Sequence, residues 1–222
     1  MMINIAIDGP SGAGKSTLAK MLAKKLGYIY VDTGALYRSI GLYMFDSGIN
    51  PKDKDAVIEA LSNIKIELRF ENGTQKVYLN GTDVKDRIRL PEMSMYASLT
   101  SAIPEVRAFL LDIQKDMAKK NNVIMDGRDI GTVILPDAQV KIFLVASSET
   151  RAKRRYKELA EKGIETSYEE VLSDIIKRDE NDSTRAVAPA VAAPDAVLLD
   201  SSDMNADEAL DAALKIIEDK IR

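Results

Sequence analysis

The chain has 222 residues, of which 45% are hydrophobic and 30% are charged, a composition typical of a globular protein with one well-buried core. Its formal net charge of −4 argues against a protein built to coat nucleic acid. Cysteine and histidine are both absent, which excludes disulfides, thiol chemistry and the commonest general base and zinc ligand.

The first predicted strand, Asn4 to Asp8, leads into the sequence GPSGAGKS at residues 9–16, a complete G-x-x-x-x-G-K-[ST] phosphate-binding loop. Its glycines let the backbone turn tightly, so that several N–H groups face phosphate oxygens. Lys15 would reach the β and γ phosphates, Ser16 would serve as a Mg²⁺ ligand, and the following helix points its positive end at the same anion. The expected nucleotide-binding residues are Asp8, Gly9, Pro10, Ser11, Gly12, Ala13, Gly14, Lys15, Ser16 and Thr17.

Helices and strands alternate beyond the loop. Helical spacing from Leu18 to Leu26 stops at Gly27, and residues 28–31 form a second strand that ends at Asp32. A helix opens at Thr33, and residues 53–61 form another short helix. A polar strand end on the same side as the phosphate loop is where open α/β sheets bind ligands.

The period then changes to strict alternation over residues 64–70, followed by strands at 77–79 and 82–84. The dipeptides Asn72-Gly73 and Asn80-Gly81 separate these runs, which is the strongest short-range signal for hairpins. We expect a three-stranded antiparallel meander inserted into the β-α-β chain. It is either a surface decoration or an element that closes over substrate.

The second half of the chain returns to alternating helices and strands. The expected elements are helices at 92–100 and 104–117, a strand at 122–125 before Asp126, a strand at 140–145, a helix at 148–160, a helix from the Ser167 to Glu170 capping box to about residue 182, a strand at 197–199 and a helix at 206–221. Five parallel strands separated by helices predict an α/β fold, a doubly wound sheet with helices on both faces.

Asp126 ends a buried strand, where an enzyme with a phosphate loop holds Mg²⁺ directly or through water. Arg151, Arg154 and Arg155 follow at i, i+3 and i+4, so like charges share one helical face. A polyphosphate between them would remove the repulsion. The alternative is a solvated basic face that pairs with neighbouring glutamates.

Arg178, Asp182 and Arg185 recur at i, i+4 and i+7, either as an intrahelical ion pair or as a polar surface for a nucleotide. Arg38 and Arg128 follow predicted strand ends. Many arginines, one phosphate loop and no histidine suit phosphoryl transfer, which needs electrostatic stabilisation and alignment more than a nucleophile. An acceptor that is already a phosphate monoester needs no base, which favours a nucleoside monophosphate over a hydroxyl acceptor.

The assembled motifs resemble the bacterial cytidylate kinases, members of the nucleoside monophosphate kinase family. The resemblance rests on IDGPSGAGKST near the start, VDTGALYR at 31–38, MDGRDIGTVILPDA at 125–138, KIFLVASSETRAKRR at 141–155 and RDENDSTRAVAP at 178–189. It implies a P-loop kinase that transfers the ATP γ-phosphate to CMP or dCMP with Mg²⁺. The alternative is another P-loop small-molecule kinase, with UMP, AMP or shikimate as acceptor.

The resemblance also implies roles for individual residues. Arg38 and Arg128 would hold the acceptor phosphate, and Lys15, Arg154 and Arg155 would join them in catalysis. The residues implied in acceptor binding are Thr33, Arg38, Ser98, Arg107, Arg128, Asp129, Arg178, Asp182 and Arg185. Arg151 would contact ATP, and Ser16 with Asp126 would hold the metal.

We expect one P-loop kinase domain over residues 1–222, with a monophosphate-binding insert at about 36–100 and a helical lid at about 151–167. The N-terminal residues lack a signal-peptide pattern, and no window approaches 18 apolar residues. We therefore expect a cytoplasmic monomer that binds nucleotides and neither nucleic acid nor membrane.

Overall fold

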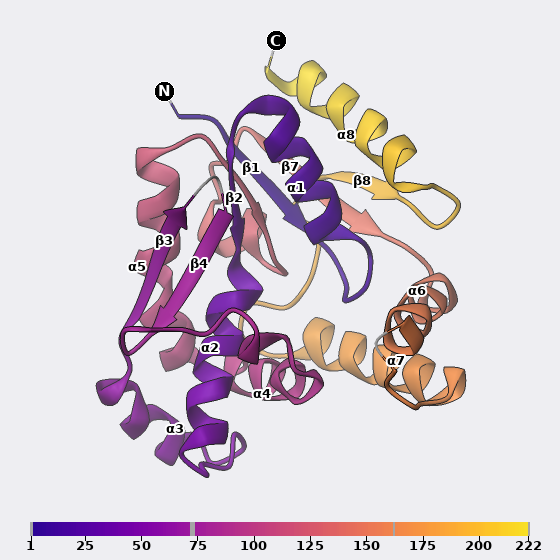
Figure 1. Ribbon diagram of the computed structural model, residues 1–222. Coiled ribbons are helices and arrows are strands. Elements are labelled where there is room, and N and C mark those ends of the chain that lie inside the picture. Colours follow the sequence, from indigo (N-terminus) through magenta and orange to yellow (C-terminus); the bar gives the residue numbers. More distant parts are fainter. Residues whose placement is uncertain (1, 72–73, 162, 222) are drawn as a thin grey trace. The chain divides into compact units, whose positions relative to one another are not determined.

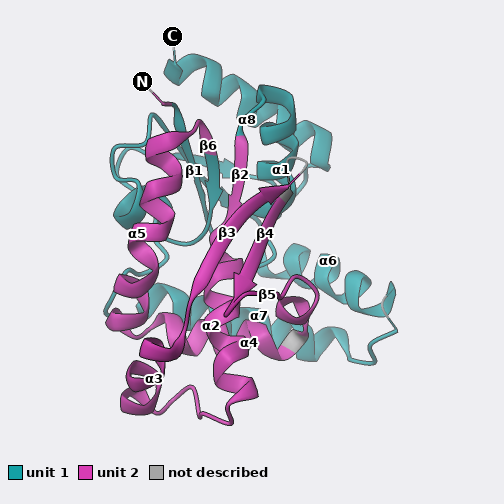
Figure 2. Ribbon diagram, turned by 60° about the vertical axis from the view of Figure 1, so that its left-hand side comes forward, with its two compact units in different colours: residues 1, 3–28, 124–222 teal, residues 2, 29–123 magenta. Residues whose placement is uncertain are grey.

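The structure is a computed structural model that describes residues 2–71, 74–161 and 163–221. It divides into two compact units (Figure 2). Residues 3–28 and 124–222 make up the first unit, and residues 29–123 make up the second. The span expected for the insert, about residues 36–100, falls within the second unit, and the span expected for the lid falls within the first.

The phosphate loop lies in the first unit. The elements of this unit are β1 (Asn4–Asp8), α1 (Lys15–Leu26), β6 (Val123–Asp126), β7 (Val140–Val145), α6 (Ser148–Glu161), α7 (Tyr168–Thr184), β8 (Val197–Asp200) and α8 (Ala206–Ile221). A π-helical turn over Ile130–Ile134 follows β6 and was not predicted.

A five-stranded sheet has the order β2-β6-β1-β7-β8, where β2 is Ile29–Asp32. Strand β1 pairs in parallel with β7, with Asp8 opposite Phe143, and β7 pairs in parallel with β8, with Val145 opposite Asp200. The expected α/β fold with a five-stranded parallel sheet and flanking helices is confirmed. In such a sheet the strands end at one edge, where ligands bind.

The sheet forms because its strands are apolar on both faces, as parallel strands in α/β proteins are. Ile5, Ile7 and Val140 have no exposed surface. Helices α1 and α8 lie side by side along the sheet (Figure 1). Leu22 on α1 and Ala213 on α8 are fully buried, so each helix turns an apolar face inward.

The second unit has its own core. Its elements besides β2 are α2 (Thr33–Asp46), α3 (Lys54–Ala60), β3 (Ile66–Glu71), β4 (Thr74–Leu79), β5 (Thr82–Asp83), α4 (Pro91–Ser101) and α5 (Pro104–Lys120). Leu36, Ile40, Met93 and Leu110 belong to one buried cluster. Gly41 on α2 lets α4 approach closely, since a Cβ there would come within 2.8 Å of the Tyr96 Cβ.

Strands β3, β4 and β5 form the predicted antiparallel meander. Its Asn80-Gly81 turn has φ angles of 49° and 82°, the left-handed backbone that such a hairpin needs. The Asn72-Gly73 turn lies outside the described residues. Two short 3₁₀ turns, Leu61–Asn63 and Arg87–Arg89, flank the meander and were not predicted.

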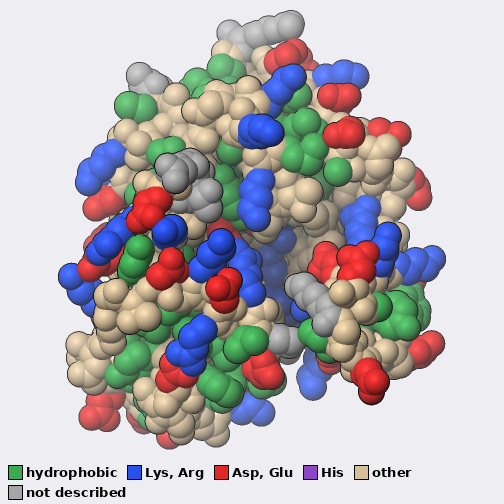
Figure 3. All heavy atoms as spheres, viewed as in Figure 1, with side chains coloured by type: hydrophobic (Ala, Val, Ile, Leu, Met, Phe, Trp, Pro, Cys, Tyr) green, Lys and Arg blue, Asp and Glu red, His purple; other side chains and the backbone are tan. Residues whose placement is uncertain are grey.

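Basic, acidic and hydrophobic side chains are interspersed over the face drawn in Figure 3. Within residues 2–71, 74–161 and 163–221, no helix combines the length and the apolar character that crossing a bilayer requires.

The fold predicts unequal effects for two glycine substitutions. A Cβ at Gly9 would lie 2.0 Å from the Leu144 carbonyl oxygen, whereas a Cβ at Gly27 meets nothing within 4 Å. Both residues have positive φ, so both variants pay for backbone strain. We expect Gly27→Ala to lower the free energy of unfolding by about 1–2 kcal/mol. Gly9→Ala should cost about 3 kcal/mol or more because it adds a clash with β7. Urea denaturation of the two variants tests this, and equal losses would contradict it.

Candidate active site

The phosphate loop joins β1 to α1. Gly9, Gly12 and Gly14 have φ angles of 141°, 75° and 94°, a backbone region that side chains disfavour. Gly14 is the N-cap of α1 and leaves the first N–H groups of the helix without a side-chain cap. Loop and helix together therefore form the anion-binding backbone that the sequence predicts.

Lys15 lies over this loop. Its side chain is buried, and its Nζ donates to the Pro10 carbonyl at 2.7 Å. Burial lowers the Lys15 pKa well below its usual value, and the positive charge of Arg128 lowers it further, against the opposing effect of Asp126. An anion in the loop would offset this penalty, as a phosphate does for a buried ammonium.

Ser16 and Asp126 bring together two oxygen ligands for a metal. The Ser16 hydroxyl donates to Asp126 Oδ2 at 2.7 Å, and Asp126 is buried at the end of β6. Mg²⁺ in kinases binds one or two protein oxygens together with substrate phosphates and waters, so this pair fits that ion. Among the described residues, no group of three or more acidic, histidine or cysteine side chains forms a complete metal cage.

Asp8 is turned away from that pair. Its two carboxylate oxygens accept from the backbone N–H groups of Ile130 and Gly131 at 2.8 and 2.7 Å. Burial raises the pKa of Asp8 to about 6, although the two hydrogen bonds favour the ionised form. Asp8 therefore ties the end of β1 to the π-helical turn after β6.

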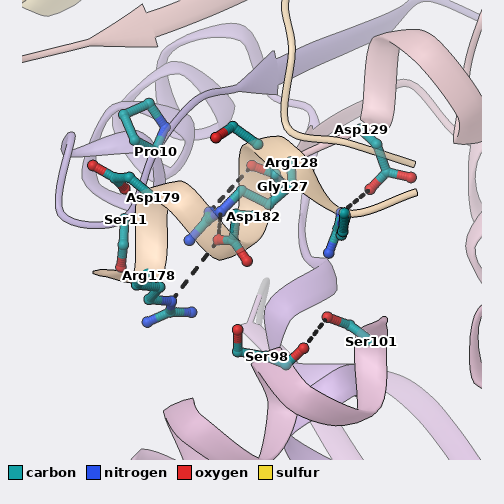
Figure 4. Close-up of polar contacts among 12 residues, drawn as sticks. Pro10, Ser11, Ser98, Ser101, Gly127, Arg128, Asp129, Arg178, Asp179 and Asp182 are labelled. Carbon is teal, nitrogen blue, oxygen red and sulfur yellow. Dashed lines mark hydrogen bonds and ion pairs between the residues drawn. The ribbon is translucent and has the colours of Figure 1, made fainter. Parts of the chain in front are cut away.

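Arg128, Asp182 and Arg178 converge in Figure 4. Arg128 Nε donates to Asp182 Oδ2 at 2.9 Å, and Arg178 Nε lies 3.9 Å from the same oxygen. Burial opposes ionisation of Asp182, but the two arginines outweigh it and hold its pKa below the usual value. The predicted pair of Arg178 and Asp182 at i and i+4 is present on α7.

Arg185 departs from the predicted helical face. Helix α7 ends at Thr184, and Arg185 adopts an extended backbone as its C-cap. From there its Nη2 lies 3.9 Å from Asp129 Oδ1, and its Nε donates to the Ala188 carbonyl at 2.7 Å. Both Arg185 and Asp129 side chains are largely buried. The i+7 spacing was therefore misleading, because the helix ends one residue too early.

The three arginines of α6 have different surroundings. Arg151 is buried and donates to protein acceptors from each of its three nitrogens. Arg154 Nη2 donates to the Ser201 and Met204 carbonyls at 2.8 and 3.3 Å. Arg155 is more exposed and pairs with Glu158 at 3.2 Å.

A pocket of about 440 Å³ opens beside the phosphate loop. Its lining comprises the loop and first turn of α1, Leu144, Arg154, Glu158 and the segment after β8, namely Ser201, Met204, Asn205, Ala206 and Ala209. Sequence analysis did not identify this last segment. Its position directly after a predicted parallel strand was the available signal, because that is the ligand-binding edge of the sheet.

In the second unit, the Asp32 carboxylate connects several predicted residues. It caps α2 by accepting from the Ala35 N–H at 2.9 Å, and it accepts from Arg38 and Arg89, each at 2.9 Å. Burial of Asp32 is outweighed by these two arginines, which lower its pKa. Gln75 of the meander bonds to both the N–H and the carbonyl of Asp32, at 2.8 and 3.2 Å.

The remaining predicted residues of the second unit lie on α2, α4 and α5. Thr33, at the start of α2, is buried. Arg107 Nη1 donates to the Ser101 carbonyl at 3.3 Å, and its guanidinium lies 5.5 Å from the Tyr37 ring centroid. The Ser101 hydroxyl in turn donates to the Ser98 carbonyl at 3.0 Å (Figure 4).

Comparison with known proteins identifies similar sequences over nearly the whole chain. Residues 5–219 match the cytidylate kinase family. A cytidylate kinase from Caldicellulosiruptor saccharolyticus is 53% identical over 96% of this chain and 95% of its own. A cytidylate kinase from Fervidobacterium nodosum is 50% identical over 100% of this chain and 99% of its own. A crystal structure of an uncharacterized protein from Eubacterium ventriosum covers 98% of this chain and 99% of its own, with a TM-score of 0.55 and 15% identity, and is alike in fold.

The environment of Asp8 predicts a pH-dependent contribution to stability. Its pKa is raised from 3.8 to about 6 on folding, so the folded state binds more protons between these values. The contribution is therefore fully present below about pH 4 and is lost as the pH rises through about 6. We expect the difference in unfolding free energy between wild type and Asp8→Asn to fall by on the order of 3 kcal/mol from pH 4 to pH 7. Urea denaturation across this range measures it, and a constant difference would refute the raised pKa.

Proposed function

Because the chain belongs to the cytidylate kinase family, we propose that it transfers the γ-phosphoryl group of ATP to CMP and dCMP, giving CDP and dCDP. The observation that carries this proposal is the family match, which extends through both units. The phosphate loop with Lys15 and the Ser16 to Asp126 pair supports it independently, since both suit a nucleoside triphosphate.

On the donor side, residues 9–17 would hold the phosphates of ATP, with Lys15 on the β and γ groups. The adjoining pocket would take the nucleoside end of ATP, between Arg154 and the segment after β8. Ser16 and Asp126 would hold Mg²⁺, which would neutralise charge on the phosphate oxygens. Arg154 and Arg155 would add positive charge near the transferring group.

On the acceptor side, each unit would contribute its own set of residues. From the first unit, Arg128 would bind the acceptor phosphate, Arg178 and Asp182 the sugar, and Asp129 and Arg185 the base. From the second unit, Arg38 would bind the phosphate, and Thr33, Ser98 and Arg107 would complete the nucleoside contacts. The carboxylate partners described above support these roles, because they hold the arginines in fixed directions.

Such a site performs phosphoryl transfer by charge stabilisation and alignment. The acceptor phosphate is already ionised at neutral pH, so no side chain has to remove a proton from it. Lys15 and the arginines would stabilise the negative charge that spreads over the transferring oxygens. A general base is not needed, which agrees with a chain that contains no histidine.

We also propose that residues of about 36–100 serve as the monophosphate-binding insert and residues of about 151–167 as a lid that excludes water from the reaction. The protein would act as a cytoplasmic monomer on free nucleotides, where both of its substrates are available.

An acceptor panel tests the proposed function. ADP release from ATP and Mg²⁺ is measured with CMP, dCMP, UMP, AMP, dTMP and shikimate. We expect kcat/KM for CMP and dCMP to exceed that for every other acceptor by about 100-fold or more, because a site built to hydrogen-bond a polar base rejects a mismatch strongly. Equal use of UMP or AMP, or activity with shikimate alone, would overturn the acceptor assignment.

Replacing Arg185 should affect one substrate only. The side chain is buried against Asp129, so Arg185→Leu removes a positioned cation and leaves a carboxylate without its partner. We expect KM for CMP to rise about tenfold or more, with KM for ATP changed by less than about twofold. Steady-state kinetics with each substrate varied in turn measures this, and exposed Lys177→Leu on α7 is the matched control. Equal losses for both substrates would exclude a role in reading the acceptor.

A further inference from the structure

Arg151 holds three segments of the first unit together. Its Nε donates to the Ala146 carbonyl at 2.8 Å, its Nη1 to the Ser11 carbonyl at 2.9 Å, and its Nη2 to Asp179 Oδ2 at 2.6 Å. The side chain is only 5% exposed. A guanidinium whose three nitrogens all bond to protein inside the fold has its direction fixed, so it differs from the more exposed Arg155 on the same helix.

The bond to Ser11 acts on the phosphate loop itself. In a planar trans peptide the carbonyl and the next N–H point in opposite directions. Fixing the Ser11 carbonyl toward Arg151 therefore fixes the Gly12 N–H toward the other side of the loop. The stem of Arg151 packs behind the same peptide, since a Cβ on Gly12 would lie 3.3 Å from the Arg151 Cβ.

The bond to Asp179 connects this peptide to α7. Asp179 Oδ1 is buried and has no hydrogen-bond partner within the described part of the chain, so the carboxylate depends on its bond to Arg151 through Oδ2. Figure 4 shows Asp179 beside Ser11 and Pro10. Asp179 neighbours Arg178 on α7, so one guanidinium links the loop to the helix that carries proposed acceptor residues.

We infer that Arg151 is a positioning residue that holds the Ser11 to Gly12 peptide with its N–H toward the phosphates of ATP and anchors it to α7 through Asp179. This inference rests on the proposed donor site. It differs from the expectation that Arg151 contacts ATP itself, because here its nitrogens already bond to protein. The effect of Arg151 on ATP would pass through the backbone of the loop.

The test compares Arg151→Met with the double variant Arg151→Met/Asp179→Leu. The single variant leaves the Asp179 carboxylate without its partner, so it should lower Tm, and the double variant should recover much of that loss. The dissociation constant for ATP with Mg²⁺, measured by calorimetry without an acceptor, should rise about tenfold or more in both variants. Lys153→Met, an exposed position on α6, is the control and should change neither quantity.

A second readout separates positioning from direct contact. In nucleotide-free protein labelled with ¹⁵N, the Gly12 amide resonance should move in both Arg151 variants and stay in place in the control. A residue that only touches ATP would leave that resonance unchanged.

Several outcomes would overturn the inference. They are an unchanged dissociation constant, recovery of ATP affinity together with Tm in the double variant, an unmoved Gly12 resonance, or failure of the double variant to fold. Wild-type turnover of CMP is recorded separately. Because ATP binding is measured without CMP, loss of the proposed acceptor would not be mistaken for failure of this inference.

Discussion

Parallel pairing of β1 with its neighbours is the constraint on which the first unit depends. It brings the ends of β6, β7 and β8 to the edge where the phosphate loop begins. Asp126 ends β6, Arg151 follows β7, and Ser201 follows β8. Residues far apart in the sequence thus surround one loop of backbone. The loop can pass close to β7 only because Gly9 has no side chain.

Charge is buried around this loop, and each buried charge is matched. Asp8 accepts from two backbone N–H groups, Asp126 accepts from Ser16, and Arg151 donates to two carbonyls and a carboxylate. Burying ions without such partners would cost several kcal/mol each. Lys15 is the exception in degree, since burial and a nearby arginine both disfavour its charged form. A site with this surplus of positive charge is complementary to an anion of high charge such as a triphosphate.

Much of the fold could be predicted because its signals are local. The phosphate loop, the Gly27 helix stop, the capping box at Ser167 and the alternation of β3 and β4 each depend on neighbouring residues. The missed features depend on contacts over long sequence distances. Asp32 appeared to be a plain strand end, yet it binds Arg89, and Asp179 appeared to be one more charge on α7, yet it binds Arg151. The π-helical turn at Ile130–Ile134 is likewise coupled to Asp8, which lies 122 residues away from Ile130.

The arginines differ in how their protein partners hold them, and this difference separates their roles. Arg38 and Arg128 each donate to a carboxylate through one part of the guanidinium, at 2.9 Å. Such a carboxylate fixes the direction of the cation and offsets repulsion between neighbouring arginines, while other N–H groups stay available to a phosphate. Arg151 instead directs all three nitrogens at protein acceptors, two of them backbone carbonyls. Residue type and helical spacing grouped it with Arg154 and Arg155. Only the direction of its hydrogen bonds distinguishes an arginine that shapes the loop from one that faces the ligand.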